Sequence, residues 1–291
     1  VGYVALTSET LGQKNVAVGY QALRLQNSTT ATDTFNTAVG YEAGEGVTTG
    51  KFNTFVGGQS ARLNTDGNNN TAVGYAALGA DAGDENTAVG LFALNACTGS
   101  NNTAVGHDAG DDVTSGNNNL ILGHDAGRTG SPGGEITTQS HEIALGDENI
   151  LEANIQVSLT VASDQRDKTD FTALDVGLDF VKALNPVTYK WDKRSKYGDK
   201  SAEDYDLNAQ TPDGTHKEDW LDVGFKAQEV EALEKAAGYK IADKTNLTTT
   251  LSKDGKQYGM QYEKFVPILV KAIQELSAKN DALEARIATL E

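Results

Sequence analysis

The stretch Asn70-Thr71-Ala72-Val73-Gly74-Tyr75 is one copy of a motif that recurs through the first half of the chain. From copy to copy, the glycine returns after 21, 17, 17, 16, 16, 17 and 23 residues. Copies, some of them degenerate, begin at Asn15, Asn36, Asn53, Asn70, Asn86, Asn102, Asn119 and Ile143. A recurrence this regular is typical of a repeat array, in which each repeat is one structural unit stacked on its neighbours.

The motif itself has the alternation of a short strand. Thr71, Val73 and Tyr75 alternate with Ala72 and Gly74, so that one face carries only small side chains and lets another backbone come close. A small anchor follows the glycine by two or three residues: Ala22, Ala43, Ala76, Ala93, Ala109 and Ala126. A coil of this size buries little apolar surface alone, so stacking and association between chains must supply the rest. The sequence therefore predicts a mainly β repeat, a trimeric β-roll or β-solenoid, over residues 1–150.

Composition divides the chain near residue 160 and excludes several classes of partner. Residues 1–162 hold 24 of the 31 glycines. The net charge of −17 would repel nucleic-acid phosphate and an anionic membrane surface, so neither is expected as a partner. The hydrophobic fraction of 38% is below the globular average, which argues against one conventional core for the whole chain.

The remaining composition narrows the chemistry. A single cysteine, Cys97, excludes an intrachain disulfide and a cysteine-based zinc site, and no apolar run is long enough to insert into a membrane. The chain starts at Val1 without an initiator methionine, so we expect it to be the C-terminal part of something longer. We predict no cofactor and no metal. The pairs His107-Asp108 and His124-Asp125, one repeat apart, leave open a metal or ion site on a trimer axis, although ordinary turns explain them better.

Beyond the repeats, residues 163–260 predict a mixture of short helices and strands. Asn185-Pro186 ends a short helix, and a polar, charged stretch at 192–219 predicts a surface loop or hairpin. The expected elements are a helix over 176–184, a strand over 187–191, a helix after Val223-Gly224-Phe225 and a hairpin across Asp254-Gly255.

Residues 261–291 form a single helical pattern. Apolar residues spaced alternately by 3 and 4 predict a coiled-coil seam: Val266, Leu269, Ile273, Leu276, Asn280, Leu283, Ile287 and Leu290. Lys279 and Arg286 are placed to pair with Glu284 and Glu291 of a parallel neighbour. The seam does not decide between two and three chains. The alternative is a lone amphipathic helix that packs on its own domain.

The junction reads Ala162-Ser163-Asp164-Gln165-Arg166-Asp167-Lys168. A serine hydroxyl becomes a nucleophile when a base removes its proton, and a lysine can be that base when burial favours its neutral form. Ser163 and Lys168 could meet if Lys168 points back from a first turn. Taken alone, this pattern is more often a solvated helix start.

Four motifs in order give this region a resemblance to a known family. Ser163–Lys168, Leu184–Trp191, Gly224–Glu231 and Tyr262–Leu276 together resemble the intramolecular chaperone auto-processing domain of phage endosialidase tail spikes. The resemblance implies a domain that trimerises, helps the preceding fibre to fold and then cuts itself away before its first serine. One departure is Lys226, where the family usually has an aliphatic residue, which leaves the local packing open.

Carried over by position, the resemblance implies a role for each junction residue. Ser163 would be the nucleophile, Lys168 the general base and Ala162–Ser163 the cleaved bond, while Asp164 and Arg166 would orient the loop. The activity would be that of a self-cleaving serine endopeptidase with a Ser-Lys dyad, a single turnover in cis and no action in trans.

The repeat resembles arrays of phage tail fibres and the Ala-Val-Gly coils of trimeric autotransporter adhesin heads. The whole chain is thus expected to be a homotrimeric tail-fibre tip of a virion or injection apparatus, folded in the host cytoplasm before assembly. Its expected parts are a β-solenoid (1–150), a junction strand (151–162), an α+β chaperone domain (163–260) and its parallel coiled-coil helix (261–291). The alternative is a structural trimeric adhesin that never cuts. A host-surface receptor or glycan as partner stays open.

Overall fold

The computed structural model describes residues 2–200, 202 and 204–290, which fall into two compact units. One unit comprises the chain up to Leu151 together with Arg194–Thr211. The other comprises Glu152–Lys193 and the chain from Pro212 onward. Among the described residues, no helix combines the length and the apolar character needed to cross a bilayer.

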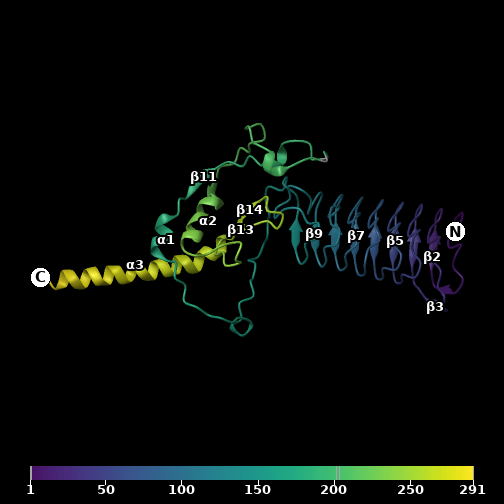
Figure 1. The fold of residues 1–291 in the computed structure, drawn as a ribbon, viewed down its shortest axis with the longest axis horizontal. Helices are drawn as coiled ribbons and strands as arrows, with labels where there is room; N and C mark the ends of the chain where they lie inside the picture. The colour runs from purple at the N-terminus through teal and green to yellow at the C-terminus, as the bar shows by residue number, and fades with distance from the viewer. Residues whose placement is uncertain (1, 201, 203, 291) are drawn as a thin grey trace. The chain divides into compact units, whose positions relative to one another are not determined.

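The first unit is a β-solenoid, as the repeats predicted, with about 7 turns over residues 12–122. Each repeat contributes one short strand, and eight strands form one parallel sheet in the order β10-β9-β8-β7-β6-β5-β4-β2. Figure 1 shows these strands in a single row, one per coil. Their bounds are β2 Val16–Val18, β4 Thr37–Val39, β5 Thr54–Val56, β6 Thr71–Val73, β7 Thr87–Val89, β8 Thr103–Val105, β9 Leu120–Leu122 and β10 Ile143–Leu145; β1 (Gly12–Gln13) and β3 (Thr32–Asp33) pair separately.

The core of the solenoid is a column of small side chains. The sheet is in register, with Ala72 of β6 beside Ala88 of β7, so that the middle residue of each strand points inward. All six predicted alanine anchors after the glycines are buried as well. Only a few large side chains, such as Phe55 and Ile121, fill the interior. A thin coil therefore closes because its inward positions are mostly alanine.

The recurring glycine is required by backbone contact between coils. Gly74 has φ +139°, and a Cβ atom built on it would lie 2.3 Å from the carbonyl oxygen of Gly90 in the next coil. A side chain at this position would meet both an unfavourable dihedral angle and a collision with rigid backbone. The glycine recurs once per coil because consecutive backbones approach each other most closely at this position.

The first residue of the motif supplies a buried hydrogen-bond ladder. The Oδ1 atom of Asn86 accepts from the backbone N–H of Asn102 at 2.9 Å, and the Nδ2 atom of Asn86 donates to the carbonyl of Gly99 at 2.9 Å. The same pattern of acceptance from the next coil holds for Asn36, Asn53, Asn70, Asn102 and Asn119. Each amide satisfies backbone groups of the neighbouring coil that have no strand partner.

The outer face of the sheet carries a row of threonines and, beside it, a stripe of partly exposed apolar side chains. Val39, Val56 and Val105 point outward, and the rings of Tyr20 and Tyr41 stack with centroids 5.3 Å apart. A continuous apolar stripe of this kind is typical of a surface that contacts another molecule.

Three α-helices and two antiparallel strand pairs build the described part of the second unit. Its core contains Val176, Phe180, Val230, Phe265 and Ile268. The predicted hairpin across Asp254-Gly255 is confirmed by the antiparallel pair β13 and β14. The bounds are η1 Gln165–Asp167, α1 Leu178–Ala183, β11 Val187–Tyr189, β12 Asp222–Gly224, α2 Ala227–Ala236, β13 Thr249–Leu251, β14 Tyr258–Met260, η4 Tyr262–Lys264 and α3 Phe265–Ala288.

The long helix α3 packs on its own unit with a face other than the predicted seam. Phe265, Ile268 and Ala272 are buried against the unit, whereas Ile273 and Leu276 are exposed. The C-terminal part of α3 projects beyond α1 and α2 (Figure 1). The alternative of a helix packed on its own domain therefore holds for the first turns of α3, but the seam residues themselves are exposed.

Residues 194–211 are part of the stretch 192–219 that the sequence predicted as a surface loop or hairpin. Their described residues form an irregular segment that is mostly exposed or half-buried and belongs to the solenoid unit. The segment contains the short helical turns η2 (Arg194–Lys196) and η3 (Leu207–Ala209), in which Ser195 and Leu207 are buried. Lys196 donates to Asn149, and Lys200 forms an ion pair with Glu148. Polar pairs 47 and 52 positions apart thus hold the segment to the end of the solenoid.

The junction strand expected over residues 151–162 is not formed in this single chain. Its alternate residues Ile155, Val157, Leu159 and Val161 are all exposed. An isolated strand has no partner for its backbone N–H and C=O groups, so an alternating pattern by itself does not make a strand.

Candidate active site at the junction

The junction ends in a tight turn that the sequence forms locally. Asp164 caps the 3-10 turn Gln165–Asp167, because its side chain accepts from the backbone N–H of Arg166 at 2.9 Å. The backbone N–H of Lys168 then bonds to the carbonyl of Gln165 at 3.2 Å and ends the turn. Aspartate before a helical turn is a favoured cap, since its carboxylate satisfies an N–H group without an intrahelical partner.

A second interaction holds the same turn. The guanidinium of Arg166 donates to both carboxylate oxygens of Asp164, with a shortest distance of 2.6 Å. This hydrogen bond lowers the pKa of Asp164 below its usual value and raises the pKa of Arg166. The two residues that the resemblance assigned to orientation therefore contact each other and shape the turn.

The turn brings the two candidate catalytic side chains together. The Nζ atom of Lys168 lies 2.6 Å from the Oγ atom of Ser163 and 3.5 Å from the carbonyl oxygen of Ser163. Ala162, on the other side of the candidate bond, belongs to the extended, exposed junction. All the predicted site residues thus lie within one short segment of the second unit.

Ser163 Oγ and Lys168 Nζ are close enough for proton transfer during acyl transfer, but the two side chains are not shielded from water. A general base must lie within hydrogen-bond reach of the proton that it removes, and 2.6 Å satisfies this condition. Both side chains are exposed in the single chain. Burial would be needed to favour a neutral amine over the ammonium form.

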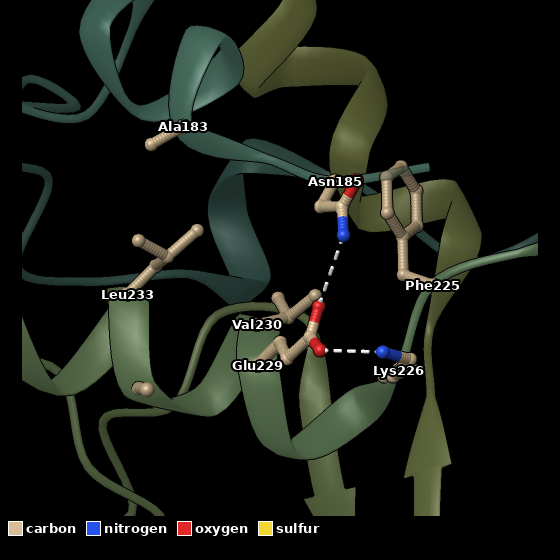
Figure 2. Close-up of a pocket in the computed structure, with 8 residues that line it drawn as sticks. Ala183, Asn185, Phe225, Lys226, Glu229, Val230 and Leu233 are labelled. Carbon is tan, nitrogen blue, oxygen red and sulfur yellow. Dashed lines mark hydrogen bonds and ion pairs between the residues drawn. The ribbon is translucent and has the colours of Figure 1, made fainter. Parts of the chain in front are cut away.

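A hollow lies apart from the junction residues and is lined by the end of α1, by α2 and by the residues just before α2. It has a volume of about 230 Å³, and its lining includes neither Ser163 nor Lys168. Figure 2 shows Asn185 and Lys226 both directed at Glu229. Lys226 pairs with Glu229 at 2.8 Å, which lowers the pKa of Glu229. The lysine that departs from the family pattern is therefore held at the helix surface by an ion pair.

Sequence reasoning missed the contact of residues 194–211 with the end of the solenoid. Glu148 and Asn149 on one side, and Lys196 and Lys200 on the other, are ordinary surface residues in the sequence. The opposite charges of the two segments are compatible with a contact, but the sequence does not show which residues so far apart in the chain will meet.

One comparison with known proteins finds a match within the second half of the chain. Residues 163–239 match the family described as chaperone of endosialidase. The comparisons with curated proteins and with solved structures give no match.

The chain thus combines a β-solenoid with a region of the chaperone-of-endosialidase type. This combination supports a tail-fibre or tail-spike type of protein with an intramolecular chaperone domain. The family bears the name of a peptidase and is linked to self-cleaving chaperone domains, which supports autoproteolysis in general terms.

Proposed function

We propose that the chain is the tip of a homotrimeric tail fibre, and that its region 163–291 assists assembly and then cuts itself off between Ala162 and Ser163. The observation that carries the cleavage proposal is the distance of 2.6 Å between Lys168 Nζ and Ser163 Oγ. The match of residues 163–239 to the chaperone family supports the assembly role.

The chemistry requires no separate substrate pocket, because the nucleophile is next to its own bond. Ser163 Oγ attacks the Ala162 carbonyl carbon through a five-membered ring while neutral Lys168 takes the hydroxyl proton. The C–N bond then breaks, the proton passes from Lys168 to the Ser163 nitrogen, and an ester joins Ala162 to Ser163. Water hydrolyses this ester, which leaves a carboxylate on Ala162 and the original hydroxyl on Ser163.

Assembly would supply what the single chain lacks at this site. The exposed seam of α3 and the exposed apolar residues of 151–162 both require neighbours to be buried. If three chains bury them, the adjacent turn at Ser163 loses water as well, and the neutral form of Lys168 is favoured. Cleavage would then follow correct assembly.

The client of the chaperone region would be the end of the solenoid. Residues 194–211 lie within the chaperone region in sequence but pack with the solenoid unit. Their pairs with Glu148 and Asn149 hold the last coil, which has no further coil to stack on. The fibre would fold in the host cytoplasm and would then be carried on a virion or injection apparatus. A host-surface receptor or glycan would be the class of ligand to test.

The exposure of Ser163 and Lys168 favours the second candidate, a structural trimeric adhesin that keeps its C-terminal domain. An exposed lysine lacks the burial that favours the neutral amine needed to accept the hydroxyl proton. The two proposals differ in one measurable product, a fragment that begins at Ser163.

Intact mass spectrometry and denaturing electrophoresis of the purified chain separate the two candidates. Cleavage gives two fragments, the second with Ser163 at its N-terminus, and Ser163→Ala gives one full-length band. Ser158→Ala is the matched control, because Ser158 is an exposed serine of the same junction. A wild-type chain that stays full length as a trimer would establish the non-cleaving adhesin.

A further inference from the structure

Two histidines occupy the same position in neighbouring coils of the solenoid. His107 follows β8 and His124 follows β9, and the register that pairs Val105 with Leu122 places one ring over the other. The ring centroids are 5.1 Å apart and the planes differ by 9°. Asp147 occupies the equivalent position after β10, since Leu145 pairs with Leu122.

Carboxylates face both rings. The Nδ1 atom of His107 lies 3.5 Å from Asp108, and the Nδ1 atom of His124 lies 3.2 Å from the Oδ2 atom of Asp125. Asp147 is a further 3.9 Å neighbour of His124. The sequence could align these residues by their spacing, but only the coil geometry places their ligand atoms together.

An arginine holds the acidic side of the cluster in place. Arg128 binds Asp108 at 2.9 Å and the Oδ1 atom of Asp125 at 3.3 Å. It also lies within 3.4 Å of Asp112 and 3.8 Å of Asp111. The Oδ2 atom of Asp125 is the one turned toward His124, and four carboxylates around one guanidinium leave the surroundings negative.

We propose that His107, His124 and Asp125 form a binding site for a late first-row divalent cation such as Zn²⁺. One ligand atom from each residue lies within 4.8 Å of the other two. Two imidazoles and one carboxylate suit zinc, cobalt or nickel, whereas calcium and magnesium prefer oxygen ligands throughout.

Binding requires only a small adjustment of exposed side chains. Zinc–nitrogen bonds are about 2.0–2.1 Å long, so the stacked rings must tilt toward one cation. The side chains of His107 and His124 are 50% and 63% exposed, which leaves them free to rotate. The bound cation would join two consecutive coils of one chain, so the stoichiometry is one ion per chain.

Titration of the untagged, chelator-treated full-length chain with Co²⁺ tests the site through the visible absorption of the protein-bound ion. We expect one saturable ion per chain, displaced by Zn²⁺ and not by Ca²⁺. His107→Gln and His124→Gln should each weaken binding at least tenfold, or about 1.4 kcal/mol. His216→Gln, which removes an exposed histidine of the other unit, should bind as the wild type does.

A stability measurement gives an independent readout. Because the cation binds the folded coils, Zn²⁺ should raise the melting temperature of the wild type and of His216→Gln but not of His124→Gln. If His107→Gln and His124→Gln bound cobalt with the same affinity as the wild type, the proposal would be overturned. A stoichiometry of one ion per three chains would also overturn it, because the ligands would then come from different chains.

Discussion

The Nζ atom of Lys168 lies 2.6 Å from the Oγ atom of Ser163, although the two residues are five positions apart. The contact is made by a 3-10 turn that Asp164 caps, and it involves only residues of this short segment. The local chain therefore supplies the distance between the proposed nucleophile and base, while in the proposed function assembly would supply the shielding from water.

Replacing the base should stop self-cleavage. We expect no cleavage in Lys168→Met, and none in Lys168→Arg, because a guanidinium stays protonated and cannot accept the hydroxyl proton. The measurement is the fraction of chain cut at Ser163 over time, by intact mass. Lys182→Met, a change at an exposed lysine of α1, is the matched control. Cleavage of Lys168→Met at the wild-type rate would contradict the dyad.

Loosening the turn should slow cleavage without unfolding the chain. Asp164→Ala removes both the cap and the pair with Arg166, so Lys168 is held less often against Ser163. Misplacement of a reacting group by about 1 Å can cost up to roughly 100-fold in rate, and we expect a loss of about tenfold here. Because Asp164 is exposed, the melting temperature should stay the same. An unchanged cleavage rate would show that the turn has no positioning role.

Disrupting the seam of α3 should prevent both association and cleavage. Ile273→Asp with Leu276→Asp places charges on exposed seam positions that would be buried between chains. Ala278→Asp, on the side away from the seam, is the control. Sedimentation gives the chain number, and electrophoresis gives the extent of cleavage. If the double variant were monomeric and still cleaved at the full rate, cleavage would not depend on assembly and the prediction would be wrong.

Breaking one rung of the asparagine ladder should destabilise the solenoid. Asn86→Ala leaves the buried N–H of Asn102 without its acceptor, whereas the carbonyl of Gly99 keeps the N–H of Gly83 as a donor. An unpaired buried N–H group costs about 1–3 kcal/mol, so the free energy of unfolding should fall by about that amount. Urea unfolding followed by circular dichroism, in a Ser163→Ala background, measures it. Asn154→Ala, at an exposed asparagine, should change little, and an equal effect of both would refute a special role for the ladder.

A buried carboxylate should make the second unit sensitive to acid. Glu234 is buried and accepts from the side chains of Thr248 and Thr249, each at 2.7 Å, as well as from three backbone N–H groups. Burial tends to raise its pKa, but these hydrogen bonds outweigh burial and leave the pKa below the usual 4.5.

The sign of the pH effect follows from that lowered pKa. The ionised group stabilises the folded state fully above pH 4.5, and the contribution is lost as the pH falls through the lower folded-state pKa. Glu234→Gln should therefore cost about 1.5–3 kcal/mol at neutral pH and less in acid. The free energies of unfolding of both proteins, measured across this range, check it. A difference that does not shrink in acid would contradict the assignment.

Much of the fold follows from the sequence because repeats carry their own geometry. A glycine every 16 or 17 residues predicts coils of equal length, and the alternation around Ala72 predicts which side chains point inward. The hairpin across Asp254-Gly255 follows from its turn residues for the same local reason. The buried ladder from Asn36 to Asn119 was not evident, since an asparagine in a motif is also typical of exposed turns.

The candidate site was predictable to the extent that it is local. Ser163, Asp164, Arg166 and Lys168 lie within six residues, and a short capped turn can bring them together without distant contacts. The strand expected over 151–162 is not formed, because strand pairing depends on a partner that the segment itself does not contain.

Short-range information thus determined the coils, the turn and the apolar seam of this chain, because each depends on residues a few positions or one repeat apart. The tertiary structure alone decided which distant groups meet: His107 over His124, and Lys200 on Glu148. Such pairs form when loops close over many residues, and the chain entropy opposing closure is offset by packing that no local pattern records.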